Sequence, residues 1–160
     1  MDGTVRIWSL RDGSALHALS GHTSLVWLLS ISATALVSAA ADSTLRVWNP
    51  SNGRLIHTLI GHTDAITCFQ HDDNKIISGS VGNLKVWDTR DGTFTRDLLT
   101  GIMGVYQVVF DRRFCIAATK RQDDTFIDVW DFVGEGSGKD EDEDNLGGDD
   151  VESDIETDDL

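Results

Sequence analysis

The sequence of 160 residues is poor in proline and cysteine, with one proline and two cysteines, and it has no long apolar run. A membrane-spanning helix needs about 20 consecutive apolar residues, so none is predicted. The first residues also lack the basic stretch and apolar core of a signal peptide. Cys68 and Cys115 each lie in an apolar, strand-like run, which favours buried thiols over a disulfide or metal ligands. We therefore expect no cofactor, no membrane contact, and a nuclear or cytoplasmic location.

Positive charge is almost missing from one end of the chain. The net charge is −14. Residues 1–133 hold 14 acidic and 12 basic side chains, whereas residues 134–160 hold 13 acids and a single base, Lys139. A nearly neutral body does not favour a nucleic-acid-binding face. The acidic segment has too little apolar surface to offset its ordering entropy, so residues 134–160 are predicted to be a disordered tail.

Four tryptophans recur at a nearly constant interval. Consecutive members are separated by 40, 39 and 43 residues, and each ends a short alternating apolar run that indicates a strand. These residues are Trp8, Trp48, Trp87 and Trp130. The first three are followed by a hairpin signal, at Asp12-Gly13, Asn52-Gly53 and Asp91-Gly92. A period of about 40 residues is typical of four-stranded propeller blades.

A Gly-His pair recurs with the same period, at Gly21-His22 and Gly61-His62. Together with the tryptophan spacing, it resembles WD40 repeats over residues 1–132. The resemblance implies a β-propeller, and we predict an all-β, open arc of about three and a half four-stranded antiparallel blades. The predicted blades cover residues 1–20, 21–60, 61–99 and 100–133. Because the first and last blades lack strands, we expect the chain to be the C-terminal portion of a longer protein.

Ser, His and Asp occur together in the second blade, as they do in hydrolases. By resemblance they form the buried structural tetrad of WD40 repeats, namely His22, Ser38, Asp42 and Trp48. The corresponding residues of the third blade are His62, Ser78, Trp87 and, nearest to the missing Asp, Asn83. A hydrolase would need an exposed nucleophile beside an oxyanion hole. Since the group recurs from blade to blade, the sequence favours a structural role and a protein that is not an enzyme.

The candidate binding surface is the top face, where propellers bind ligands around the start of the innermost strand of each blade. The residue after the first apolar position of that strand points there. These residues are Trp27, Thr67 and Tyr106, and Leu25 and Gln107 are their neighbours. For Trp27, packing under a neighbouring loop is an equally good interpretation, because an aromatic ring with one polar edge suits both roles.

The irregular features of these repeats are similar to those of the fungal cell-division-control F-box/WD40 proteins. They are the segments 25–29 and 36–42, the short hairpin Ser78–Trp87, the pair Ala117-Ala118 and the closing Asp131-Phe132. These relatives are substrate receptors of SCF ubiquitin ligases, which implies phosphorylated protein substrates, SCF components as partners and a nuclear location. By position, Leu25 and Tyr106 match apolar pocket residues that contact the peptide before its phosphothreonine. Gln107 stands where some relatives have an arginine.

Two parts of such a receptor have no counterpart in this chain. The arginines that cradle the central phosphate lie in earlier blades, and the F-box that recruits the ligase is also absent. Two alternatives therefore stay open. The first alternative to a receptor is a WD40 scaffold for another protein complex without a ubiquitin role. The second is a truncated fragment without a function of its own.

Overall fold

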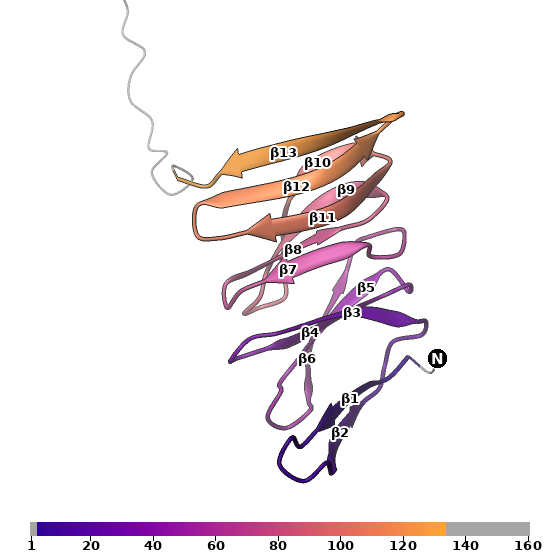
Figure 1. Ribbon diagram of the computed structural model, residues 1–160, viewed down its shortest axis with the longest axis vertical. Coiled ribbons are helices and arrows are strands. Elements are labelled where there is room, and N and C mark those ends of the chain that lie inside the picture. Colours follow the sequence, from indigo (N-terminus) through magenta and orange to yellow (C-terminus); the bar gives the residue numbers. More distant parts are fainter. Residues whose placement is uncertain (1–2, 134–160) are drawn as a thin grey trace, which may run out of the picture.

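The computed structural model describes residues 3–133, which contain thirteen β-strands and no helix (Figure 1). The strands are β1 (Val5–Trp8), β2 (Ala15–Leu19), β3 (Val26–Ile31), β4 (Leu36–Ala40), β5 (Thr44–Trp48), β6 (Leu55–Ile60), β7 (Cys68–His71), β8 (Lys75–Gly79), β9 (Gly82–Asp88), β10 (Phe94–Ile102), β11 (Gly104–Phe110), β12 (Phe114–Arg121) and β13 (Asp124–Asp131). This part of the chain therefore has no helix that could cross a membrane. The predicted acidic tail, residues 134–160, lies outside the described residues.

The strands form four antiparallel sheets in which neighbours follow the chain order. The sheets are β1–β2, β3–β6, β7–β10 and β11–β13. In Figure 1 they succeed one another along the vertical axis, from β1–β2 at the foot to β11–β13 at the head, without closing into a ring. The prediction of an all-β, open, propeller-like arc is confirmed. Each sheet is one blade, and we number the blades 1 to 4.

The same tight turn joins the two outer strands in each of the first three blades. At its end, Gly13, Gly53 and Gly92 have φ values of 74°, 70° and 73°. Each glycine amide donates to the carbonyl four residues earlier, over 2.9 to 3.0 Å. This left-handed backbone region is open to glycine without steric cost, which explains the recurring Asp-Gly and Asn-Gly signals.

The core lies between successive sheets rather than inside any one of them. Trp48 is buried between blades 1 and 2, and Trp87 is buried between blades 2 and 3. Each repeated tryptophan thus packs toward the blade that precedes it. Within the described residues no blade precedes blade 1, and Trp8 is 53% exposed, whereas Trp48 and Trp87 are 2% exposed. The burial of a blade's tryptophan therefore depends on its neighbour.

Both cysteines are buried and unpaired, as the sequence indicated. They belong to the core between blades 3 and 4. Burial disfavours the charged thiolate and raises the pKa of Cys68 to about 11 and that of Cys115 to about 12. Both thiols are therefore protonated at neutral pH, which is the less nucleophilic form.

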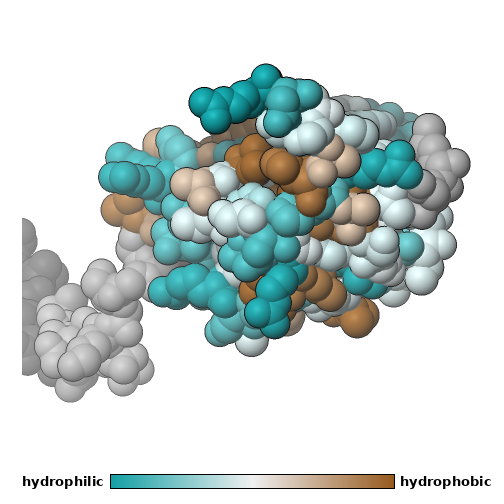
Figure 2. Space-filling view, turned by 90° about the horizontal axis from the view of Figure 1, so that it is seen from below, coloured by the Kyte–Doolittle hydropathy of each residue, from teal (hydrophilic) through white to brown (hydrophobic). Residues whose placement is uncertain are grey.

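The two ends of the arc carry apolar side chains that no other described residue covers. At the foot these include Trp8 and Leu16, and at the head Ile127 and Val129, which are 67% and 59% exposed. Figure 2, seen from the β1–β2 end, shows apolar groups interrupted by hydrophilic ones. Strands β1 and β13 also have one edge without a paired strand among the described residues.

Strand β10 continues beyond residue 99, where the sequence placed the end of blade 3. It reaches Ile102 through three irregularities in its pairing with β9, and Gly101 has a φ of 70°. Blades 2 and 3 begin with a Gly-His turn that ends the preceding strand, whereas blade 4 has none. The strand therefore runs on until Ile102 is buried in the core between blades 3 and 4.

Candidate protein-interaction surface and the clamps that support it

Blade 2 contains a buried chain of four hydrogen-bonded side chains. Trp48 Nε1 donates to Ser38 Oγ over 2.8 Å, and Ser38 Oγ lies 2.8 Å from His22 Nε2. His22 Nδ1 lies 2.9 Å from Asp42 Oδ2. Because the Asp42 carboxylate only accepts, Nδ1 carries the imidazole proton and Nε2 accepts the Ser38 hydroxyl proton. This clamp joins β4 and β5 to the loop before β3.

The charges in this clamp are set by its surroundings. Burial alone would raise the pKa of Asp42, but hydrogen bonds from the Thr44 hydroxyl, the Thr23 amide and His22 lower it to about 2. Burial lowers the pKa of His22, and the nearby Asp42 opposes that shift only in part. At neutral pH the clamp therefore pairs a carboxylate with a neutral imidazole.

The buried clamp has the residue types of a catalytic triad without the access that catalysis needs. Ser38 is fully buried, and its hydroxyl is engaged by two partners. A substrate carbonyl has no route to this oxygen unless the blade opens. The arrangement can hold strands together, but it cannot present a nucleophile.

Blade 3 has a shorter version of the same clamp. Trp87 Nε1 donates to Ser78 Oγ over 2.9 Å, and Ser78 Oγ lies 2.7 Å from His62 Nε2. Where blade 2 has Asp42, the nearest side chain is Asn83, and both His62 Nδ1 and Asn83 Oδ1 are buried without a hydrogen-bond partner among the described residues. Burial lowers the pKa of His62 to about 4, which the nearby Asn83 opposes only in part.

Completing this clamp is expected to stabilise the protein. In an Asn83→Asp variant the new carboxylate accepts the His62 Nδ1 proton, and Lys85 close by limits the cost of the added charge. We expect the free energy of unfolding to rise by about 1 kcal/mol and the pKa of His62 to move up toward its ordinary value. Urea unfolding and an NMR titration of the imidazole measure the two effects. Asn83→Ala is the control, since it offers no acceptor; a gain in that variant, or a loss in Asn83→Asp, would contradict the mechanism.

Blade 4 has a different clamp, which sequence reasoning missed. Thr119 is fully buried, and its hydroxyl donates to Asp128 Oδ2 over 2.7 Å. The other oxygen of Asp128 pairs with Arg121. The sequence carried one signal of this change: the position two residues before the tryptophan is basic in the first three blades and acidic in the fourth. These residues are Arg6, Arg46, Lys85 and Asp128.

The predicted surface residues Trp27 and Thr67 occupy equivalent positions and link neighbouring blades. Trp27 Nε1 donates to the Ile66 carbonyl of blade 3 over 2.7 Å. The Thr67 hydroxyl donates to the Val105 carbonyl of blade 4 over 2.6 Å. Trp27 is still 49% exposed. One edge of its ring therefore secures the next blade while the rest remains available on the top face.

Tyr106 occupies the same position in blade 4, where no further described blade receives its hydroxyl. It is 59% exposed, and among residues 3–133 its hydroxyl has no hydrogen-bond partner. Pairing slips by one residue at Tyr106 and also at Trp27, so both lie in a β-bulge. A bulge turns a side chain out of the regular alternation. The top face thus carries an accessible aromatic residue in blade 2 and another in blade 4.

Two further predicted residues lie beside this row rather than in it. Leu25 is half-buried just before β3, and its carbonyl accepts the Ala41 amide. Gln107 comes after the bulge, pairs with Ala118, and alternates with the buried Val108. It therefore faces the open side of blade 4. The structure brings Trp27, Thr67 and Tyr106 into one row, with Leu25 at its edge and Gln107 on a different face.

Residues 3–133 contain no group of three or more His, Cys, Asp or Glu side chains arranged to hold a metal ion. What they offer is an exposed row of side chains on rigid blades. Such a surface is suited to binding another polypeptide.

Comparisons with known proteins agree with this picture. The family model "WD domain, G-beta repeat" matches residues 13–49 and 53–88. Cell division control protein 4 of Candida albicans is 51% identical over 138 residues, which cover 82% of this chain and 20% of that protein. This chain therefore spans about a fifth of that relative's length.

Two other matches have lengths similar to that of this chain. Regulator of rDNA transcription protein 13 of Saccharomyces cerevisiae is 32% identical over 154 residues, covering 82% of this chain and 83% of that protein. Among solved structures, the computationally designed Ika4 protein superimposes with a TM-score of 0.74 at 31% identity. That match covers 81% of this chain and 80% of the designed one.

Proposed function

Because the chain belongs to the WD40-repeat family, we propose that it recognises phosphorylated segments of other proteins, as the substrate-binding part of an F-box/WD40 receptor of an SCF ubiquitin ligase. WD40 propellers are generally non-catalytic interaction modules, so binding rather than chemistry is the activity. The 51% identity to Cell division control protein 4 of Candida albicans carries the finer proposal. Under it, the F-box and the remaining blades belong to the rest of the receptor, which acts in the nucleus.

The top face supplies the contacts in this proposal. Tyr106 presents an exposed ring with an unengaged hydroxyl, and Trp27 presents the free part of its indole. Aromatic side chains of this kind contribute large contact areas with few rotatable bonds, and they dominate the energy of many interfaces. We assign Tyr106 and Leu25 to the apolar residues that precede the phosphate of the bound peptide.

Truncating Tyr106 is expected to weaken peptide binding. With the full-length protein, Tyr106→Ala lowers the affinity for a phosphothreonine peptide with apolar residues before the phosphate by about tenfold, as loss of an aromatic anchor does. Fluorescence anisotropy with a labelled peptide measures this change. Leu10→Ala is the control, because the Leu10 side chain is fully exposed in the turn after β1, at the far end of the arc.

Phosphate dependence is tested in the same assay with an unphosphorylated twin of the peptide. Phosphate recognition requires charge-assisted hydrogen bonds, so the twin should bind much more weakly. Equal affinity of the full-length protein for both peptides would exclude the phosphopeptide receptor.

A second candidate is a WD40 scaffold without a role in ubiquitin transfer. The observation in its favour is the match to Regulator of rDNA transcription protein 13, which this chain covers over 83% of its length. Under this alternative the same top face binds an unmodified protein. Affinity purification from the source cells separates the two, since ligase subunits recovered together with the protein support only the first.

A further inference from the structure

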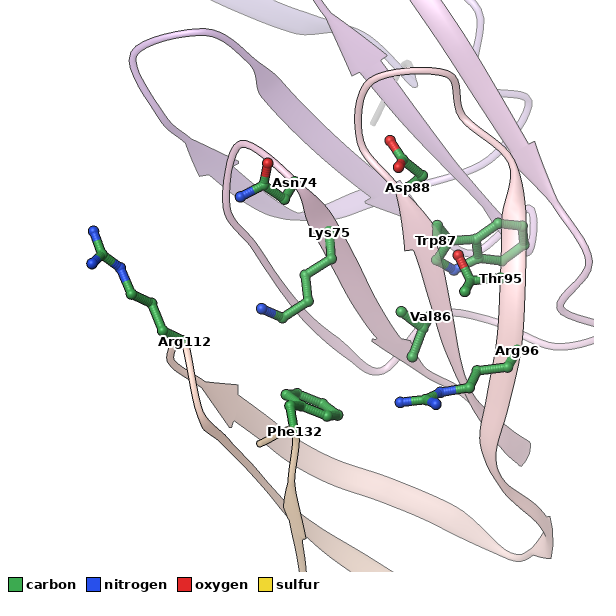
Figure 3. A pocket seen from close by; sticks show the side chains of 9 residues that line it. All are labelled: Asn74, Lys75, Val86, Trp87, Asp88, Thr95, Arg96, Arg112 and Phe132. Atoms are coloured by element: carbon green, nitrogen blue, oxygen red, sulfur yellow. The ribbon is translucent and has the colours of Figure 1, made fainter. Parts of the chain in front are cut away.

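A groove of about 410 Å³ separates blades 3 and 4 on the bottom face, opposite the end where β3, β7 and β11 begin. Its walls come from the start of β8, the end of β9, the start of β10, the turn between β11 and β12, and the segment that follows β13 (Figure 3). Three basic side chains line it, Lys75, Arg96 and Arg112, with Phe132 among them. One carboxylate, Asp88, also lines the groove, but Arg90 pairs with it over 3.0 Å.

The repeats provide an internal reference for this groove. A smaller cavity of about 250 Å³ occupies the corresponding place between blades 2 and 3. The turns before β4, β8 and β12 are residues 32–35, 72–75 and 111–114. In each turn the amide of the first residue donates a hydrogen bond to the carbonyl of the fourth. This bond makes Lys75 the counterpart of Ala35, and Arg112 the counterpart of Asp73. Strand pairing makes Arg96 the counterpart of His57, since Val86 faces Arg96 as Val47 faces His57.

At these three positions the difference between the two grooves adds positive charge. Ala35 and Asp73 of the first groove, and His57 beside it, are replaced by lysine, arginine and arginine in the second. The first groove is also lined by Arg90, which pairs with Asp88. In the first groove, Asp73 accepts hydrogen bonds from the hydroxyls of Thr34 and Ser32, over 2.5 and 3.1 Å. Its counterpart Arg112 is exposed and forms no ion pair among residues 3–133. The groove between blades 3 and 4 is thus a cationic version of a common structural feature.

The aromatic ring of Phe132 lies near two of these cations, although Lys75 also pairs with Asp72 over 3.4 Å and lies 4.5 Å from the centre of the Phe110 ring. Lys75 Nζ lies 5.5 Å from the centre of the ring, and the guanidinium carbon of Arg96 lies 5.8 Å from it. The Phe132 amide donates to the Arg113 carbonyl over 2.6 Å, which fixes the chain at this point. Residues 134–160, with 13 acids and one lysine, therefore start two residues from a fixed point inside the groove.

We propose that the acidic segment 134–160 of this chain binds back into the groove formed by Lys75, Arg96, Arg112 and Phe132. The attraction is between carboxylates and the cationic side chains. Direct linkage at Phe132 makes the encounter intramolecular, at an effective concentration in the millimolar range. The bottom-face groove and the top-face row lie at opposite ends of the strands, so this contact leaves Trp27 and Tyr106 accessible.

Paramagnetic NMR on the full chain tests this contact. A nitroxide is attached to a Ser153→Cys variant; the native thiols do not compete, because both are buried and have raised pKa values. At the millimolar effective concentration of a tethered segment, the amide peaks of Lys75, Arg96 and Arg112 are expected to lose about half of their intensity or more. The peaks of Ala35 and Ile56, in the groove between blades 2 and 3, serve as the internal control.

The matched variant carries Lys75→Ala and Arg112→Asp, which give the groove the residues of its counterpart and are therefore compatible with the fold. It is expected to restore the peak intensities, as is about 1 M NaCl, where the Debye length is about 3 Å. Equal losses in both grooves, or losses that persist in the double variant, would overturn the proposal. A mixing experiment tests for contact between two molecules, in which nitroxide-labelled protein without isotope enrichment is added to isotope-enriched protein without a nitroxide. Equal broadening in that mixture would also overturn the proposal, since the contact would then join two molecules.

Discussion

Replacing Ser38 by alanine is expected to lower the free energy of unfolding by about 2–4 kcal/mol, because the change leaves two buried polar groups without partners. Ser38 Oγ accepts from Trp48 Nε1 and donates to His22 Nε2, each over 2.8 Å. Water cannot replace the hydroxyl, since Ser38 is fully buried. Each orphaned group then carries its own desolvation cost of about 1–3 kcal/mol.

Urea unfolding followed by tryptophan fluorescence measures this loss. Ser51→Ala is the control, because that side chain is exposed and its hydroxyl forms no hydrogen bond among the described residues. Ser78→Ala removes the equivalent hydroxyl of blade 3 and should have a similar effect. A change below about 0.5 kcal/mol, the usual range for surface positions, would show that Ser38 does not hold the clamp together. Loss of an activity without loss of stability would instead favour the catalytic interpretation of His22, Ser38 and Asp42.

Acidification is expected to destabilise the protein by about 2–3 kcal/mol between pH 7 and pH 4. Burial lowers the pKa of His62 to about 4, below its ordinary value of 6.5. The unfolded chain therefore binds a proton at a higher pH than the folded one does. The stability from the neutral imidazole is fully present above pH 6.5 and is lost as the pH falls toward 4. His22 contributes in the same direction, because burial lowers its pKa as well.

The carboxylate of Asp42 acts in a separate pH window. Its folded pKa of about 2 lies below the ordinary 3.8, so its contribution is present above pH 3.8 and is lost only below that value. Urea titrations at half-unit intervals of pH resolve the two windows. In a His62→Gln variant the slope between pH 6.5 and pH 4 should fall, since an amide does not titrate. An unchanged slope in that variant, or a flat profile for the native chain, would contradict this assignment.

The period of the tryptophans was sufficient to predict the blades, because one buried indole per blade interface imposes a spacing that survives changes elsewhere. The clamp of blade 2 was predictable for a related reason: each of its members is a side chain, so each is visible in the sequence. The links from Trp27 and Thr67 to the next blade were not, since they end on backbone carbonyls that every residue possesses. The residue types therefore do not show which carbonyl accepts these hydrogen bonds.

The remaining differences arise from backbone register. A one-residue bulge at Tyr106 places Gln107 on the open side of blade 4, and a side-chain alternation counted from the sequence cannot anticipate it. In blade 4, the hydrogen bonds among Thr119, Asp128 and Arg121 stand in place of the His-Ser-Asp-Trp clamp of blade 2 and likewise join neighbouring strands. Its acidic residue is conspicuous only when the four tryptophan-terminated runs are placed side by side.

The donors on the top face give the arc a direction. Blade 2 donates to blade 3 through Trp27, and blade 3 donates to blade 4 through Thr67, whereas the Tyr106 donor of blade 4 has no acceptor among residues 3–133. An assembly in which each unit contacts only its neighbours behaves as a one-dimensional array. Damage to a central blade breaks two interfaces and damage to a terminal blade breaks one, so the array frays from its ends. A closed ring has no such ends. In a ring, the Tyr106 hydroxyl would be a hydrogen-bond donor available to a neighbouring blade.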